Sequence, residues 1–276
     1  MILESPGAIA FKLGNITVHW YGIIIAVAFM ASLYIATRLA AKNNENPDNI
    51  IDLSSYILLG GVISARLYYV IFNWDYFSRH TEDIIKVWQG GLSIHGALIG
   101  VAVIAIAYCK TKKISFLKYA DIISCSAILG QAIGRWGNFF NSEAYGMPAK
   151  LPISLYIPPE LRPVEYKAYE YYHPTFLYES LWNLAVFLLL YFVLYKRLKN
   201  FIGAIFFLYL ILYSLGRLII ESIRIDNIFS VFGLPIAQFA SIVLIITGVI
   251  GFYAIFRSSK NRLDTGNSFS YNNVDS

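Results

Sequence analysis

The sequence predicts an all-α integral membrane protein of seven transmembrane helices with a small external head, N-terminus outside and C-terminus cytoplasmic. Of its 276 residues, 57% are hydrophobic and only 14% are charged, about half the charged fraction of a soluble domain. Seven apolar runs have lengths that suit membrane crossing, and basic residues gather on alternate connections between them. The composition therefore excludes a disordered chain, a disulfide scaffold and a soluble enzyme.

The apolar runs give the predicted helices in chain order. They lie at roughly 18–40, 51–72, 92–109, 119–134, 174–195, 201–222 and 235–256. The first run is expected to remain as a helix, because Glu4 and a lone Lys12 precede it where a signal peptide would carry a basic segment. The fourth run is the shortest of the seven.

The polar remainder of the chain is small. It comprises an external stretch near 73–90, a longer external segment at 136–172 and a tail rich in Asn and Ser at 263–276. This composition favours a disordered cytoplasmic tail. Residues 1–262 are then predicted to form a single polytopic membrane domain.

Orientation follows from the basic residues. Twelve of the 22 follow the first run, separate the third from the fourth, separate the fifth from the sixth, or follow the seventh. With seven crossings all twelve lie on one side, which the positive-inside rule makes cytoplasmic. This asymmetry accounts for the pI near 9.0 without a nucleic-acid partner.

Six helices each carry a polar residue at a similar predicted depth. Counted from the cytoplasmic ends, each lies roughly 21–26 Å into a core of about 30 Å. The six are Tyr21, Arg66, His95, Arg135, Glu179 and Arg217. Such residues can snorkel to the interface or pair as structural contacts between helices, but ionisable residues within spans are functional candidates by default. A ring at this depth suits the headgroup of an outer-leaflet lipid.

The sixth run adds charges on one helical face. Arg217, Glu221 and Arg224 are spaced i, i+4 and i+7, so their side chains share that face. The glutamate can simply neutralise the arginines, yet two guanidinium groups with one carboxylate leave net positive charge. A guanidinium fork matches a phosphate in a bidentate manner.

An ordered polar string closes the fourth run. Residues 134–146 read GRWGNFFNSEAYG, with glycines that permit tight turns and with an arginine, two asparagines and a glutamate as polar groups. The string resembles the signature of the bacterial phosphatidylglycerol–prolipoprotein diacylglyceryl transferases. Further stretches resemble that family in the same order along the chain: HWYG at 19–22, ARLYYV at 65–70, GGLSIHGALIG at 90–100, HPTFLYE at 173–179, and Gly216-Arg217 through Glu221 and Arg224.

The resemblance implies a membrane-embedded transferase. Its reaction moves the diacylglyceryl group of phosphatidylglycerol to the thiol of the lipobox cysteine of a preprolipoprotein, forming a thioether and releasing glycerol phosphate. This is the first step of bacterial lipoprotein maturation. The resemblance also implies a multi-pass protein of the bacterial cytoplasmic (inner) membrane with its active site toward the outer leaflet. The partners are phosphatidylglycerol, the lipobox peptide and the lipid bilayer, and no cofactor or metal is expected.

Candidate roles follow from the chemistry and the resemblance. His95 is the hypothetical general base, because an imidazole titrates near neutrality; hydrogen bonding to the lipid is its alternative role. His19, His80 and His173 remain alternative titrating groups. Arg135 and Arg217 are expected to hold the phosphate and to count with His95 as catalytic.

The other candidate residues are expected to bind substrate or to support the site. The substrate-binding candidates are Arg135, Asn138, Glu143, Tyr21, Arg217, Glu221, Arg224 and Gly146. The structural or supporting candidates are Arg66, Glu179 and Asn141. Cys109 and Cys125 lie too near the cytoplasmic side to act as nucleophiles, which the substrate supplies instead.

The main rival from another class is a transporter or flippase for an anionic lipid. It would share the arginines and the seven helices. It would also require a polar path that continues to the cytoplasmic side, where Asp121 is the only acidic residue in the inner third of the fourth run. The ordered motifs favour the enzyme.

Overall fold

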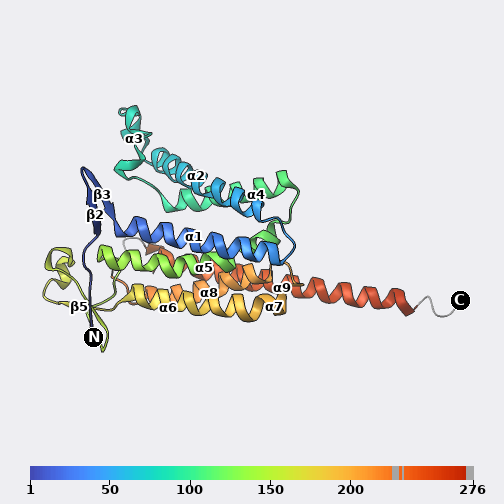
Figure 1. Ribbon diagram of the computed structural model, residues 1–276. Coiled ribbons are helices and arrows are strands. Elements are labelled where there is room, and N and C mark those ends of the chain that lie inside the picture. The colour runs from blue at the N-terminus through green and yellow to red at the C-terminus, as the bar shows by residue number, and fades with distance from the viewer. Residues whose placement is uncertain (226–229, 232, 272–276) are drawn as a thin grey trace. The chain divides into compact units, whose positions relative to one another are not determined.

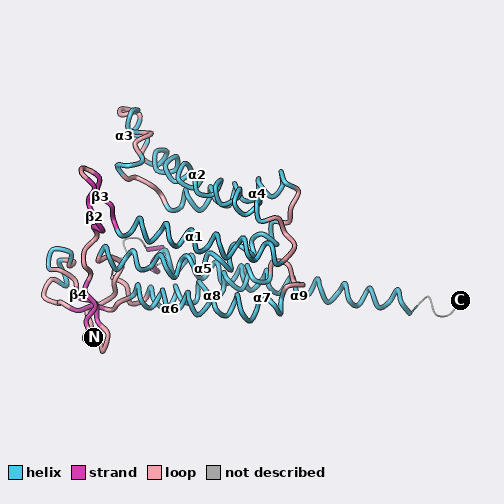
Figure 2. Tube along the Cα trace, viewed as in Figure 1, coloured by secondary structure: helices cyan, strands magenta, loops and turns pink. Residues whose placement is uncertain are grey.

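The computed structural model describes residues 1–225, 230–231 and 233–271 (Figure 1). It is predominantly helical, with short strands near the N-terminus and in the loops (Figure 2). In the described part of the chain, seven helices are long and apolar enough to cross a membrane. The predicted all-α membrane fold is therefore confirmed.

The long helices follow the predicted order. Their bounds are α1 Trp20–Lys42, α2 Pro47–Phe72, α4 Ile94–Lys112, α5 Phe116–Asn141, α6 Thr175–Leu188, α8 Ala204–Glu221 and α9 Ile236–Tyr271. A π-helical turn at Leu189–Leu194 joins α6 to α7, Tyr195–Leu198, so that these three segments make one span.

The prediction for the fourth run was wrong at its outer end. The helix α5 has 26 residues and continues to Asn141, so residues 136–141 are helical; their location outside the membrane stays a prediction. The polar string lowers the hydropathy of these turns, but aromatic packing holds them in place. Phe139 lies 4.9 Å from Phe176, and Phe140 stacks on Trp20 at 4.9 Å, between ring centroids.

The last helix also extends beyond its predicted end. The helix α9 reaches Tyr271, so residues 263–271 are helical where the sequence predicts a disordered tail. A physical reason is the lack of any proline between 237 and 271, since proline is the strongest helix breaker. Residues 272–276 of that tail lie outside the described residues.

The chain divides into two compact units. Met1–Ile35 and Ala120–Ser276 form unit 1, and Ala36–Tyr119 forms unit 2. In unit 2, α2 packs along α4. An arm, defined as residues 73–93, connects them and contains α3, Trp74–Phe77, and 3-10 turns at Thr81–Asp83 and Val87–Gln89. The prediction of a single membrane domain over 1–262 stays a prediction.

In unit 1, α8 packs along both α6 and α9. Two small sheets involve the N-terminal strands. The strand β1, Ile2–Glu4, pairs in parallel with β4, Ser154–Tyr156, which pairs antiparallel with β5, Tyr171–Tyr172. The strands β2, Ile9–Leu13, and β3, Ile16–His19, form a hairpin directly before α1. Two further strands, β6 Ser230–Val231 and β7 Leu234–Pro235, precede α9.

A head, defined as residues 142–174 with β1, covers one end of α5 and α6. It includes 3-10 turns at Pro159–Leu161 and Val164–Tyr166. Its core is formed by buried apolar residues: Tyr145, Leu155, Ile157, Tyr172 and Phe176. Since Phe176 belongs to α6, this core joins the head rigidly to the membrane helices.

Asp121 links α5 to the start of α8. This residue is 8% exposed, and its carboxylate accepts hydrogen bonds from the backbone N–H groups of Gly203 at 2.6 Å and Phe206 at 2.8 Å. The first N–H groups of a helix have no partner within the helix, and a negative charge is favourable there. The acidic residue weighed as part of a transport path is therefore a helix cap.

Replacing Asp121 with alanine is expected to destabilise the protein by about 2–3 kcal/mol, because it removes two charge-assisted hydrogen bonds and leaves buried N–H groups without partners. Asp121→Asn keeps one acceptor and should cost less. Denaturant unfolding in detergent measures the difference. Equal stability of Asp121→Ala and wild type would contradict the capping role.

Candidate active site

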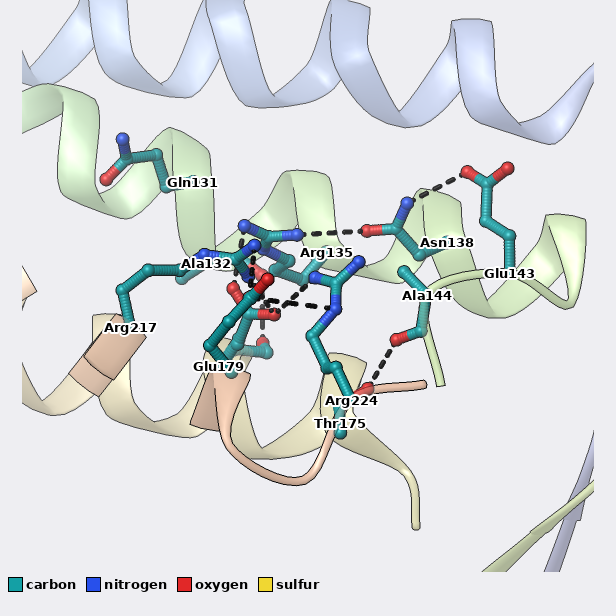
Figure 3. A network of polar contacts seen from close by, with 12 residues as sticks. Gln131, Ala132, Arg135, Asn138, Glu143, Ala144, Thr175, Glu179, Arg217 and Arg224 are labelled. Carbon is teal, nitrogen blue, oxygen red and sulfur yellow. Dashed lines mark hydrogen bonds and ion pairs between the residues drawn. The ribbon is translucent and has the colours of Figure 1, made fainter. Parts of the chain in front are cut away.

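Glu179 of α6 is the centre of a charged cluster in unit 1 (Figure 3). Its Oε2 lies 2.7 Å from Arg135 Nη2 of α5, and its Oε1 lies 2.9 Å from Arg217 Nη1 of α8. Arg224 Nη1, just beyond α8, lies 3.3 Å from the same Oε1. The Glu179 side chain is 4% exposed. One buried carboxylate thus pairs with three arginines from different parts of the chain.

A second carboxylate completes the cluster. Glu221 Oε2 lies 2.6 Å from Arg217 Nη2 and 3.8 Å from Arg224 Nε. These contacts join the residues of the i, i+4, i+7 face, as their spacing predicts. Three arginines and two glutamates give the cluster a formal charge of +1. Burial makes uncompensated charge costly, so the cluster favours a singly charged anion as ligand.

Polar side chains extend the cluster along α5. Arg135 Nη1 donates to Asn138 Oδ1 at 3.5 Å, and Asn138 Nδ2 donates to Glu143 Oε1 at 2.9 Å. Asn141 Nδ2 donates to the same glutamate oxygen at 3.3 Å. The predicted set Arg135, Asn138, Asn141 and Glu143 is therefore brought together. With 22% of its side chain exposed, Arg135 is the most accessible of the three cluster arginines.

The loop after α5 is held in a strained conformation. Ser142 and Ala144 have positive φ angles of 52° and 55°, which costs about 1–2 kcal/mol for a residue other than glycine. The Thr175 hydroxyl donates to the Ala144 carbonyl, and the Glu143 N–H donates to the Asn138 carbonyl at 3.0 Å. These bonds hold Glu143 over the end of α5, and backbone strain of this kind concentrates at functional sites.

Gly146 lies where three segments meet. Its N–H donates to the His173 carbonyl at 3.0 Å, and it forms a β-bridge with Arg224. A Cβ at this position would lie 2.8 Å from both His173 Cβ and the Ile223 carbonyl oxygen. Close packing therefore explains why residue 146 is glycine, and this packing fixes the backbone beside Arg224. The contact of Gly146 with substrate stays a prediction.

Tyr21 lies close to Gly137 of α5, the helix that carries Arg135. A Cβ on Gly137 of α5 would lie 2.6 Å from Tyr21 Cδ2. The ring of Tyr21 therefore lies against α5 at Gly137, which lies between Arg135 and Asn138 in the sequence. Tyr21 is 40% exposed. Its predicted role in substrate binding remains a prediction.

Arg66 belongs to unit 2 and organises the arm. Its guanidinium donates to four backbone carbonyls, those of Asp83 at 2.6 Å, Ile84 at 2.9 Å, Gly90 at 2.6 Å and Gly91 at 3.0 Å. With 7% exposure, the guanidinium is committed to the backbone of the arm. These contacts hold the arm against α2, and the assignment of Arg66 as a supporting residue stays a prediction.

His95 is the second residue of α4, directly after the arm. The Ser93 N–H donates to the Ala65 carbonyl of α2 at 3.1 Å, and this bond holds the start of α4 against α2. The imidazole is exposed, and its ring centroid lies 6.4 Å from that of Tyr68. Its role as the base stays a prediction.

Asp83 makes the stability of the arm depend on pH. The ammonium of Lys86 and the hydroxyl of Tyr76, each 2.6 Å from its carboxylate, hold the pKa of Asp83 below its ordinary value of 3.8. The folded-state pKa is thus lower than the unfolded one. The stabilisation is present above the unfolded pKa and is lost as pH falls through the folded-state value.

Hydrogen exchange of residues 74–91, corrected for the intrinsic pH dependence, is expected to lose protection on acidification below pH about 4. The variant Asp83→Asn should show the weaker protection already at neutral pH. Equal protection of variant and wild type at neutral pH would contradict this role of Asp83.

The sequence placed Glu179 among the structural or supporting residues without identifying its partners, and the structure places it between the arginines of α5 and α8. A signal was available, because Glu179 is the only charged residue in the run 174–195. Reasoning also missed Ser180, whose hydroxyl donates to the Ala132 carbonyl at 2.8 Å and accepts from Trp136 Nε1 at 3.2 Å.

Comparisons with known proteins show which proteins this chain is similar to. A family model described as prolipoprotein diacylglyceryl transferase matches residues 8–254. A phosphatidylglycerol–prolipoprotein diacylglyceryl transferase of Acaryochloris marina is 44% identical over 264 residues, which cover 96% of each chain. One from Trichormus variabilis is 46% identical over 256 residues, 91% of this chain and 90% of that protein. One from Synechocystis is 43% identical over 265 residues, 95% of this chain and 93% of that protein.

Proposed function

The chain belongs to the prolipoprotein diacylglyceryl transferase family, and from this we propose that it joins the diacylglyceryl group of phosphatidylglycerol to a lipobox cysteine of a preprolipoprotein. The chain is a multi-pass membrane transferase. In the reaction, the cysteine sulfur attacks the carbon of the diacylated glycerol that carries the phosphate. A C–S bond forms, the C–O bond breaks, and glycerol phosphate leaves with the electron pair.

The observation that supports this proposal most directly is the cluster around Glu179. A phosphodiester carries one negative charge, which the formal charge of +1 matches. Guanidinium groups bind phosphate oxygens in a bidentate manner, and Arg135 and Arg217 belong to adjacent helices at the cluster. Negative charge grows on the departing oxygen as the C–O bond breaks, so fixed positive groups there stabilise the transition state.

The remaining task is to activate the thiol. A free cysteine has a pKa of about 8.5, and the thiolate is the attacking species. In the proposed reaction His95 accepts the thiol proton, while Asn138 and Glu143 orient the glycerol headgroup and Glu221 orients Arg217 and Arg224. No metal or organic cofactor enters the reaction as written.

The proposed location is the bacterial inner membrane, with the site toward the outer leaflet. The distribution of basic residues supports it, because the predicted cytoplasmic connections lie at the opposite ends of the spans from the cluster. A phospholipid can then present its headgroup from within the leaflet, while the secreted acceptor arrives from the outer side.

The proposal is tested with purified protein, phosphatidylglycerol and a lipobox peptide, analysed by mass spectrometry. The expected product is a peptide with the added mass of a diacylglyceryl group that survives thiol reductants, as a thioether does. A folded protein that binds the lipid but yields no such adduct would contradict the transferase and favour lipid transport.

Replacing His95 with alanine is expected to abolish thioether formation while phosphatidylglycerol binding persists, because the base acts on the thiol and not on the lipid. His80→Ala is the matched control, since His80 is an exposed histidine that stacks on Tyr76 within the arm. Normal turnover of His95→Ala would remove His95 as the base.

A further inference from the structure

A cavity of about 480 Å³ lies in the head, apart from the charged cluster. Its walls come from two short segments and include Pro148, Ala149, Lys150, Tyr169, Glu170 and Tyr171. Its volume is within the range of small-ligand pockets. We propose that this cavity binds the extended polypeptide that follows the acceptor cysteine, an inference that rests on the proposed function.

The walls of the cavity are rigid and preformed. The Ala149 N–H donates to the Tyr171 carbonyl at 2.9 Å, and Pro148 forms a β-bridge with Tyr172. On the other side, β5 pairs with β4, and the Ile157 N–H donates to the Glu170 carbonyl at 3.2 Å. Tyr172 is fully buried in the head core. A preformed site limits the entropy lost on binding.

The side chains of the cavity suit a polypeptide better than a lipid headgroup. Lys150 and Glu170 bring opposite charges to it, and neither forms an ion pair with any residue that the structure describes. Tyr169 is 54% exposed and supplies an aromatic wall. Paired opposite charges do not select an anion, whereas aromatic rings and polar groups of both signs match peptide groups and mixed side chains.

The cavity is also connected to the cluster along the chain. Gly146, which forms the bridge to Arg224, precedes the first wall by two residues, and the second wall leads through Tyr172 to Thr175 at the start of α6. Glu179 lies one turn further along α6. A polypeptide held in the cavity would therefore contact the same elements that position the arginines.

The proposal is tested with two acceptor peptides that share the lipobox. One stops just after the cysteine, and the other continues for about ten residues, roughly 33 Å when extended. Glu170→Lys and Tyr169→Ala are expected to raise KM for the long peptide about tenfold, a loss of about 1.4 kcal/mol. KM for the short peptide, KM for phosphatidylglycerol and kcat should stay unchanged.

The control is Glu165→Lys, which makes the same charge change in the same head at an exposed residue outside the cavity. It should leave every constant unchanged. Equal KM values of both variants and wild type for the long peptide would overturn the cavity proposal while leaving the transferase intact. A rise in KM for phosphatidylglycerol alone would also overturn it, because the cavity would then serve the lipid. Absence of thioether product from wild type would instead refute the proposed function.

Discussion

Glu179→Gln is expected to reduce both stability and activity more than any other single change in the cluster. The substitution leaves three arginines with one carboxylate in a buried site. Removing one partner of a buried ion pair costs about 3–5 kcal/mol, because the remaining charge lacks compensation. The arginines would also move apart, and a displacement of about 1 Å in a catalytic group can lower the rate ~100-fold.

Two measurements on the same preparation test this expectation. Denaturant unfolding in detergent gives the free energy of unfolding, and mass spectrometry gives the rate of thioether formation. Glu179→Asp keeps the charge and should recover part of the stability. Glu165→Gln, at an exposed position in the head, is the neutral control. Wild-type stability and turnover of Glu179→Gln would show that this carboxylate does not organise the arginines.

Arg135→Lys is expected to lower kcat/KM about 100-fold, roughly 2.7 kcal/mol of transition-state stabilisation. Arg135 contacts Glu179 through one terminal nitrogen and Asn138 through the other. Lysine keeps the positive charge but has a single terminal nitrogen, so it cannot reproduce the fork. The ion pair with Glu179 should persist, so stability should change little.

The discriminating measurement for Arg135→Lys is steady-state kinetics over a range of phosphatidylglycerol concentrations, with the free energy of unfolding determined in parallel. Arg79→Lys, an exposed arginine of the arm, serves as the matched substitution. A kcat/KM of Arg135→Lys near the wild-type value would mean that charge alone suffices at this position. The bidentate role would then be wrong.

The sequence allowed the spans and one helical face of the cluster to be predicted, because both depend on local patterns. Hydropathy gives the seven helices, and the i, i+4, i+7 spacing joins Arg217, Glu221 and Arg224. The outer turns of α5 were not predicted, since a polar string ends an apolar run. Packing of Phe139 on Phe176, which is distant in sequence, keeps those turns helical.

Contacts between helices were the main source of error. The partners of Glu179 lie on α5, on α8 and just beyond α8, and no local pattern identifies them. Asp121 illustrates the same limit, because a lone acidic residue in a span gives no sign that it binds the first N–H groups of another helix. The position of His95 relative to the cluster stays a prediction, since these residues belong to different units.

The helices α5 and α8 are fastened to one another at three levels. Asp121 binds the start of α8, Gln131 Nε2 donates to Tyr209 Oη at 3.0 Å, and Glu179 joins Arg135 to Arg217. Axial sliding of one helix past the other by a turn would break all three connections together. Relative sliding of α5 and α8 is therefore disfavoured, and these two helices are expected to move as one body. A crosslink between α5 and α8 should accordingly leave turnover intact.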